Sequence, residues 1–297
     1  MSASLVLFGP TASGKSSLAM ELARRNRGEI INMDSMQIYK EMDVGTAKPL
    51  AKEREEIPHH LFDLVEPHEE FSAVMYKELA LETIKEIQSR GNNAILVGGT
   101  GLYLSALYYD YSFRPQNHTL KEKYRHLYEE EGLESLQKEV ELLYPSLYSE
   151  IDRSNPHRLL RLLESQGQED KRQRSSLELD VFLLEIPPEV LNQRIEERVK
   201  MMMQEGLLEE VKKLYERYGD VEYLPALKGI GYKEFYPYLR GEISLEDAME
   251  RQIIHTRQYA KRQRTWGRNQ YTDIHKLDAE ASLEEKVAQV EKLWRKA

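Results

Sequence analysis

The stretch that most constrains this chain lies close to its N-terminus and reads Gly9-Pro10-Thr11-Ala12-Ser13-Gly14-Lys15-Ser16. It fits the phosphate-loop pattern G-x-x-x-x-G-K-[ST] at every fixed position. Such a loop binds phosphate only between a strand and a helix, because that turn aims backbone N–H groups at the ligand. The apolar run 5–8 and the helical spacing of residues 17–23 meet both conditions. A polyphosphate is therefore the first ligand to consider.

Each fixed position of this loop has an expected task. Gly9 and Gly14 permit the backbone geometry, Lys15 is expected to reach the outer phosphates, and the Ser16 hydroxyl is expected to ligate Mg²⁺. The sequence thus predicts Mg²⁺ as the cofactor, with Ser16 as its protein ligand. A chance match in a glycine-rich turn is the alternative, and the flanking strand and helix argue against it.

The composition is that of a globular protein. The 297 residues suffice for one large core and a smaller domain, and 40% of them are hydrophobic while 31% are charged. No apolar run approaches the roughly 20 residues of a membrane helix, and the start of the chain lacks the pattern of a signal peptide. The absence of cysteine fits a reducing compartment. We therefore expect a cytoplasmic protein, monomeric and without membrane contact.

Strand and helix patterns alternate along most of the chain, which predicts an α/β fold: a P-loop NTPase-like core with a parallel sheet flanked by helices. The middle of the chain is instead helical and strongly charged, and we expect an all-helical insertion there. The predicted domains are residues 1–112 with 178–297 for the core and 113–177 for the insertion. The predicted strands are residues 5–8, 29–32, 60–65, 93–97, 180–186 and 272–277, and a long basic helix is expected over residues 244–266.

A polar residue follows each of two predicted strands. Asp34 comes after residues 29–32, and a carboxylate at the carboxyl end of a strand in such a sheet points into the ligand crevice. It is a candidate catalytic group, although capping the following turn suits it equally. Residues 93–97 lead into Gly98-Gly99-Thr100, where many nucleotide hydrolases have a metal-organising Asp. The glycines allow close backbone approach and Thr100 offers a hydroxyl, but such a turn also simply connects a strand to a helix.

Basic residues gather in a few places on an acidic chain. The net charge of −9 argues against a protein that coats nucleic acid with its whole surface. Residues 251–272, however, contain six cations and no acidic residue, which favours a polyanionic partner on one face. The alternative is a solvated helix face whose counter-charges come from neighbouring elements.

Two arginine pairs are spaced as neighbours on helix faces. Arg158 and Arg161 follow a predicted helix start at Asn155-Pro156. Arg194 and Arg198 are four residues apart, so their guanidinium groups can fold over bound phosphates. Pairing with Glu196 or Glu197 on an exposed face is the alternative for the second pair.

Several segments together resemble one family, the tRNA dimethylallyltransferases, also called tRNA isopentenyltransferases. The resemblance extends in order over most of the chain and is weakest over residues 111–150 and beyond Tyr271. It is carried by residues 9–16, Asp34-Ser35-Met36-Gln37-Ile38-Tyr39, residues 42–49, Pro58-His59-His60-Leu61, residues 96–103, Asn155-Pro156-His157-Arg158-Leu159 and residues 256–263.

The resemblance implies a reaction that is unusual for a phosphate loop. Dimethylallyl diphosphate would take the place of a nucleotide, and the exocyclic N6 amine of the adenine 3′ of the anticodon would attack its allylic carbon. Diphosphate would leave, so that the loop holds a leaving group.

The resemblance also implies roles for particular residues. Asp34 would be the general base, Thr100 would lie beside the reaction channel, and Arg198 would join Lys15 and Mg²⁺ in neutralising the departing diphosphate. Because the acceptor adenine is stacked in its loop, it must be flipped out, and phosphate contacts elsewhere can offset that cost. The residues expected to bind tRNA are Asp34, Ser35, Met36, Gln37, Lys123, His157, Arg158, Arg161, Lys228, Lys233, Arg257, Lys261, Arg262 and Arg264.

Two other functions fit parts of the same sequence. A small-molecule kinase also combines a phosphate loop with an Asp after the second strand. A non-catalytic RNA-binding switch would use nucleotide binding to control the basic face. The occurrence of Asp34-Ser35-Met36-Gln37 and Gly98-Gly99-Thr100 together with the basic helix favours the transferase over both.

Overall fold

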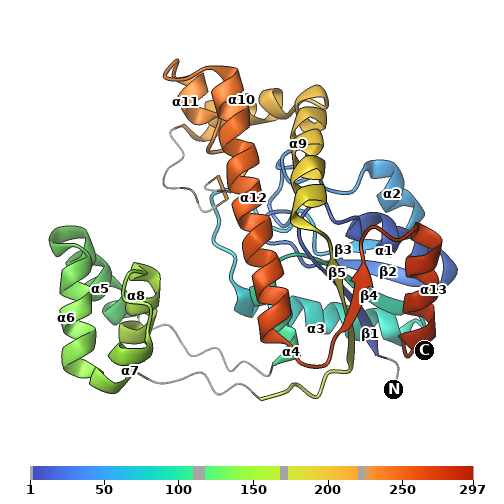
Figure 1. The fold of residues 1–297 in the computed structure, drawn as a ribbon, viewed down its shortest axis with the longest axis horizontal. Coiled ribbons are helices and arrows are strands. Elements are labelled where there is room, and N and C mark those ends of the chain that lie inside the picture. Colours follow the sequence, from blue (N-terminus) through green and yellow to red (C-terminus); the bar gives the residue numbers. More distant parts are fainter. Residues whose placement is uncertain are drawn as a thin grey trace. The chain divides into compact units, whose positions relative to one another are not determined.

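A computed structural model describes residues 3–109, 118–167, 173–219, 224, 226–227 and 229–296 of the chain. In this part of the chain six parallel strands form one sheet in the order β3-β2-β4-β1-β5-β6 (Figure 1). The inner strands are buried along almost their whole length, which explains why they read as continuous apolar runs. The strands are β1 Ser4–Phe8, β2 Gly28–Asn32, β3 His59–His60, β4 Asn93–Gly98, β5 Leu179–Glu185 and β6 His275–Asp278.

Helices pack around this sheet and complete the core. Helix α1 packs on β1, β2 and β4, α3 packs on β2 and β4, and the long α12 runs beside α9 and reaches α4. This arrangement confirms the predicted α/β fold with a parallel sheet flanked by helices. The helices are α1 Lys15–Arg25, α2 Ala51–Glu56, α3 Ala73–Ser89, α4 Gly101–Tyr108, α9 Pro188–Gln204, α10 Leu207–Tyr218, α11 Tyr236–Leu239, α12 Leu245–Gln270 and α13 Leu283–Leu293.

The chain divides into two compact units. One consists of Met1–Tyr108 and Ser175–Ala297, and the other of Tyr109–Arg174. The second unit contains α5 His118–Glu131, α6 Leu133–Leu143, α7 Pro145–Glu150 and α8 Pro156–Glu164 around a small apolar core of its own. Helix α8 begins as the sequence predicts, because the Asn155 side chain accepts hydrogen bonds from the next two N–H groups after Pro156. We propose that this unit is the insertion predicted over residues 113–177.

One predicted strand is mostly absent. Residues 60–65 are expected to be extended, but β3 contains only His59 and His60. The backbone φ of Leu61 is 63° and that of Asp63 is 54°, and these left-handed conformations turn the chain away from the edge of β2. Only an isolated bridge between Tyr39 and Val65 continues the pairing. At the other edge of the sheet, the strand expected over residues 272–277 is β6, and α12 continues to Gln270 rather than ending near residue 266.

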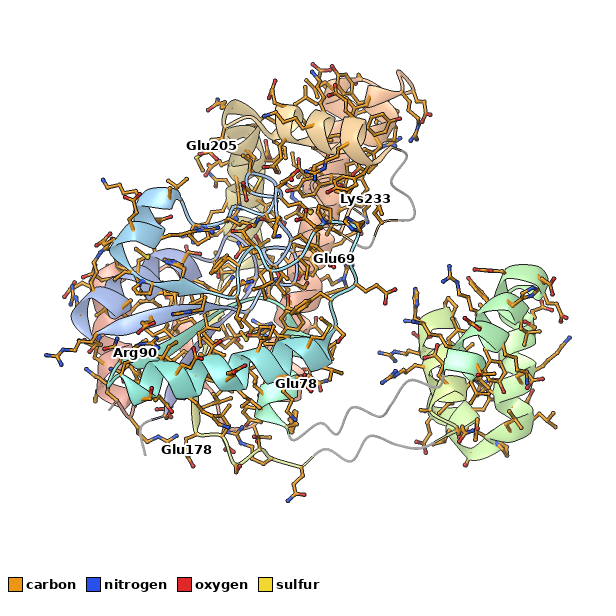
Figure 2. All side chains as sticks on the ribbon, turned by 180° about the vertical axis from the view of Figure 1, so that it is seen from behind. Glu69, Glu78, Arg90, Glu178, Glu205 and Lys233 are labelled. Carbon is orange, nitrogen blue, oxygen red and sulfur yellow. The ribbon has the colours of Figure 1, made fainter. Side chains whose placement is uncertain are left out.

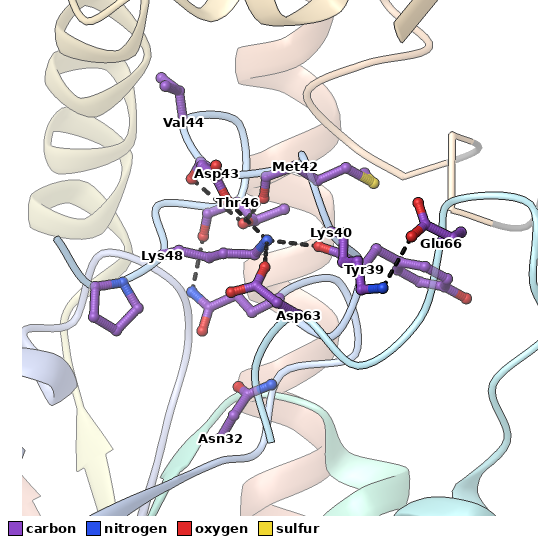
Figure 3. Close-up of polar contacts among 12 residues, drawn as sticks. Asn32, Tyr39, Lys40, Met42, Asp43, Val44, Thr46, Lys48, Asp63 and Glu66 are labelled. Carbon is purple, nitrogen blue, oxygen red and sulfur yellow. Dashed lines mark hydrogen bonds and ion pairs between the residues drawn. The ribbon is translucent and has the colours of Figure 1, made fainter. Parts of the chain in front are cut away.

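The loop after β2 is held by a buried lysine (Figure 3). The side chain of Lys48 is 1% exposed, and its Nζ donates to the Tyr39 carbonyl at 2.6 Å, to Asp43 at 2.8 Å and to Asp63 at 2.5 Å. Arg54 donates to the second oxygen of Asp63 at 2.6 Å. Lys48 therefore ties residues 39–48 to the segment after β3. This also fixes one wall of the cavity described below, because part of that loop lines it.

We expect Lys48→Met to lower the free energy of unfolding by about 2 to 3 kcal/mol, because two carboxylates lose a buried cation while Asp63 keeps Arg54. Lys40→Met is the matched control, since the Lys40–Glu66 pair in the same loop is partly exposed and such pairs contribute less than about 1 kcal/mol. Urea denaturation measures both variants. Equal losses would show that Lys48 is not a structural anchor.

Candidate active site

The phosphate loop joins β1 to the first turn of α1. Ala12 and Gly14 have positive φ angles of 61° and 86°, so the backbone curls before the helix begins. The Nζ of Lys15 lies over this curl, 2.5 Å from the Pro10 carbonyl oxygen and 3.5 Å from the Ser13 hydroxyl. The loop lines a cavity of about 210 Å³ together with Asp34, Gln37, Lys48, Arg198 and Gln263. Thus the predicted loop and two of the three predicted catalytic residues share one cavity.

Asp34 has both of the roles that its position suggests. Its Oδ1 accepts a hydrogen bond from the Met36 N–H at 2.9 Å, so it caps the turn after β2. It also faces the cavity, where burial raises the pKa of its carboxyl group while Lys15 and Arg198 act in the opposite direction. A carboxylate whose pKa is raised in this way is a stronger base than one in water.

The two cations beside Asp34 are also kept from water. Burial lowers the pKa of Lys15 from 10.5 to about 7, against the attraction of Asp34 and with the repulsion of Arg198. Burial likewise lowers the pKa of Arg198. An anionic ligand would restore the charge of Lys15, because a second negative group beside the ammonium favours its protonated form.

Thr100 fixes the position of the turn that carries Asp34. Its Oγ1 accepts a hydrogen bond from the Ser35 N–H at 2.9 Å and donates to the Ser35 hydroxyl at 3.3 Å. The backbone N–H of Thr100 donates to the Met33 carbonyl at 3.2 Å. Thr100, the third predicted catalytic residue, thus contacts Ser35, which follows Asp34 in the chain, and holds the turn that contains both.

The glycines before Thr100 allow close approach of protein groups. A Cβ on Gly98 would lie 2.0 Å from the Met33 carbonyl oxygen, and one on Gly101 would lie 2.4 Å from the Trp266 ring. Larger residues at these positions would push the Asp34 turn or α12 off the sheet. The pattern Gly98-Gly99-Thr100-Gly101 therefore serves the packing of the site as well as the connection of strand to helix.

A second cavity, of about 310 Å³, adjoins the first at Asp34. Thr11, Asp34 and Arg198 line both cavities. The second cavity is also lined by Ser35, Met36, Thr256, Tyr259, Arg262 and Lys233, of which Lys233 is labelled in Figure 2. Asp34 thus separates a cavity rich in phosphate-loop groups from one bordered by exposed cations of α12 and the preceding loop.

Two residues of α12 contribute to the site without being predicted. Gln263 accepts a hydrogen bond from the Thr11 N–H at 3.0 Å and donates to the Gly99 carbonyl at 2.9 Å. Tyr259 lies beside Thr100 and Gln263, and burial together with Asp34 raises the pKa of its hydroxyl. A search for positive charge in this helix selects its cations and passes over both residues. Helical spacing could have predicted them, because residues 259 and 263 lie one turn apart on the same face of the helix.

The basic residues of α12 point in different directions. Arg262 is exposed at the second cavity and lies over the Tyr259 ring, and Lys261 is exposed. Arg257 instead lies 3.4 Å from Glu196 of α9, and Arg264 lines a separate pocket beside Glu185. The run is therefore not one continuous basic face.

Of the remaining predicted residues that the structure describes, Gln37 alone lines one of the two cavities beside Asp34. Arg194 lines a larger cavity of about 1100 Å³ that also contacts Gly14 and Arg198. Gln37, at the first cavity, donates to the Thr46 and Ala47 carbonyls. Lys228 lies outside the described residues. The other four belong to the helical unit, where Lys123 lies over the Tyr124 ring and the exposed residues of α8 are His157, Arg158 and Arg161.

A metal site built from protein carboxylates and histidines is absent from the described residues. The Ser16 hydroxyl lies at the first turn of α1 within the cavity. A divalent ion there would therefore take most of its oxygen ligands from a diphosphate and from water, a set that Mg²⁺ commonly accepts. The site fits Mg²⁺ only together with a phosphate ligand.

Comparison with known proteins identifies the family. A family model described as IPP transferase matches residues 37–270. The chain belongs to this family. The tRNA dimethylallyltransferases of Acetivibrio thermocellus and Bacillus subtilis are 44% and 40% identical to this IPP transferase over 276 residues, which is 89% of this chain and 88% and 87% of theirs. The predicted family membership is confirmed.

Solved structures agree with this assignment. The tRNA isopentenylpyrophosphate transferase of Bacillus halodurans is 35% identical with a TM-score of 0.74, covering 98% of this chain and 95% of that one. A eukaryotic dimethylallyltransferase acting on tRNA is 32% identical with a TM-score of 0.81, covering 97% and 77%. Among the described residues of this IPP transferase, no helix has the length and apolarity required to span a membrane.

The lowered pKa of Lys15 predicts how anion binding depends on pH. Above pH 7 the free protein loses the ammonium proton, so pyrophosphate affinity should fall by up to about tenfold per pH unit relative to that of Lys15→Arg, which stays charged. Titration calorimetry from pH 6 to 9 on both proteins gives this ratio, in which the titration of pyrophosphate itself cancels. A ratio that does not change with pH would contradict the depressed pKa.

Proposed function

We propose that this protein transfers a dimethylallyl group from dimethylallyl diphosphate to the N6 amine of the adenine 3′ of the anticodon in tRNA, releasing diphosphate. The observation that carries the proposal is Asp34, which lies where a cavity of the phosphate loop meets a cavity bordered by basic residues. The names of the relatives and of the eukaryotic structure support the same reaction.

The diphosphate would bind at the phosphate loop, residues 9–16. Lys15 and Arg198 face the first cavity, and Arg194 lies farther out in the adjoining one. As the bond from the allylic carbon to oxygen breaks, the electron pair moves to the diphosphate, and these cations stabilise the growing charge. Lys15 and Arg198 are partly buried, which strengthens the effect.

The adenine would enter from the second cavity. The amine nitrogen forms a bond to the allylic carbon and loses one proton, which Asp34 is positioned to accept. Burial raises the pKa of Asp34, which makes its carboxylate a better proton acceptor. Thr100 holds Ser35 and thereby the Asp34 turn, so its role is to position the base and to border the channel.

Mg²⁺ would be held by Ser16 and by the diphosphate oxygens, and when bound it supplies charge neutralisation of the leaving group. The Ser16 hydroxyl lies in the same cavity as Lys15. Every other part of the proposed reaction uses groups of the chain itself.

The tRNA would be held by cations of both units. In the core unit, Arg262 and Lys233 border the second cavity, and Lys261 is exposed on the same helix. In the helical unit the candidates are Lys123, His157, Arg158 and Arg161, which are separate in sequence from the phosphate loop. We infer a cytoplasmic location because the substrate is tRNA, and a monomeric enzyme stays a prediction.

The direct test is transfer of label from dimethylallyl diphosphate to unmodified tRNA, with labelled ATP offered in parallel. Prenyl label on the adenine and inert ATP support the proposal. Consumption of ATP with a metabolite would favour a kinase, and RNA binding without either reaction would favour a switch.

We expect Asp34→Asn to retain tRNA binding and to lose about 10²- to 10⁴-fold in transfer rate, because the amide cannot accept the amine proton. The amide keeps an oxygen for the Met36 N–H, so the turn should survive. Single-turnover transfer and RNA binding measure the two properties. Wild-type rates in this variant would remove Asp34 from the mechanism.

The structure separates two arginines that the sequence treats alike. Arg262→Gln should weaken tRNA binding, because this exposed cation borders the second cavity. It should also reduce the slope of log affinity against log salt concentration by up to about one unit. Arg264→Gln is the matched control on the same helix and should change neither quantity, since Arg264 faces the pocket beside Glu185. The salt dependence of RNA affinity measures both. Equal effects would show that RNA contacts both faces of α12.

A further inference from the structure

We propose that Gln263 is a positioning residue that couples RNA docking on α12 to diphosphate binding by the phosphate loop. The inference rests on the proposed function, because it requires both ligands. One neutral side chain would thereby link the binding of RNA to the binding of diphosphate.

The Gln263 amide joins two loops. It is 4% exposed, its Oε1 accepts from the Thr11 N–H at 3.0 Å, and its Nε2 donates to the Gly99 carbonyl at 2.9 Å. An amide side chain can accept and donate at once, which a carboxylate or an ammonium cannot do. Gln263 thereby connects the loop after β1 with the turn after β4.

This connection is rigid because the packing around it is tight. A Cβ on Gly99 would lie 2.0 Å from the Gln263 Nε2, and a Cβ on Gly267 would lie 2.8 Å from Leu183 of β5. Helix α12 therefore rests directly on the ends of the strands at both of these points. A shift of the helix must move the turn and the phosphate loop with it, since closely packed interiors do not absorb such shifts.

The same helix carries the groups expected to meet RNA. Arg262 precedes Gln263 and borders the second cavity, while Tyr259, one turn earlier, lines the same cavity and lies beside Thr100 and Gln263. RNA that contacts Arg262 and stacks its adenine near Tyr259 would fix the helix face on which Gln263 lies. Thr11, a residue of the phosphate loop whose N–H donates to Gln263, would then be held in one orientation.

Two ligands that favour one arrangement of a shared element bind more tightly together, and the effect is reciprocal. Diphosphate binding at the loop should therefore strengthen RNA binding by the same factor by which RNA strengthens diphosphate binding. RNA and diphosphate are both anions and repel each other. This repulsion lowers the factor equally in wild type and in variants whose net charge is that of wild type. The comparison between variants isolates the contribution of Gln263.

The test measures the affinity of inorganic pyrophosphate with and without a saturating anticodon stem-loop RNA, and the reverse. We expect the coupling factor of wild type to exceed that of Gln263→Met by about fivefold or more, whatever the change in each separate affinity, because the factor is the ratio of the affinities with and without the other ligand. Gln258→Met is the matched control, because Gln258 is exposed on the same helix, and it should keep the wild-type factor.

Equal coupling factors in wild type and Gln263→Met would overturn the inference while leaving the transfer reaction intact. Failure of wild type to bind RNA or pyrophosphate at all would overturn the proposed function and the inference with it. Should Gln263→Met fail to fold, Gln263→Asn keeps the neutral amide but is one methylene too short to reach both Thr11 and Gly99, and its coupling factor must also fall. Hydrogen exchange on wild type gives an independent reading: RNA alone must slow exchange in residues 9–14, and unchanged exchange would refute the coupling.

Discussion

The site depends on the partial burial of charges of both signs in one place. Lys15 and Arg198 lie around Asp34. Burial raises the pKa of Asp34 and lowers the pKa values of Lys15 and Arg198, so that in each group it favours the neutral form. Their mutual attraction opposes that shift without abolishing it. A cluster in this condition gains from a ligand that brings negative charge, because the ligand restores the protonated lysine and replaces lost solvation.

Parallel strand topology is what brings these charges together. The phosphate loop follows β1, Asp34 follows β2, and Thr100 follows β4, and these three strands are neighbours in the sheet. Their carboxyl ends therefore open on one edge, where ligands bind in open α/β sheets. Arg198 and Gln263 come from α9 and α12, which pack side by side over the same edge. The fold thus builds the two cavities from the segments that follow the strands and from these two helices.

The sequence could predict the parts of this site that a short motif or a strand end defines. The phosphate loop, Asp34 and Thr100 were found in this way, and the family resemblance was confirmed by the comparisons. Gln263 was missed because its partners, Thr11 and Gly99, are distant in sequence and its role depends on packing. The prediction of a strand at residues 60–65 was wrong for a related reason. The apolar pattern of these residues does not indicate the left-handed conformations of Leu61 and Asp63.

Charge runs illustrate the same limit and also suggest how RNA is discriminated. On a helix, residues 262 and 264 are about 200° apart, so adjacent cations in sequence face different surroundings. Arg264 lines a pocket that Glu185 also lines, and Arg257 pairs with Glu196, which leaves Arg262 and Lys233 exposed at the second cavity and Lys261 exposed on the same helix. The net charge of −9 disfavours nucleic acid over most of the surface. In the core unit, a polyanion would therefore gain most affinity where it reaches this small set of cations, beside the cavity that Asp34 lines.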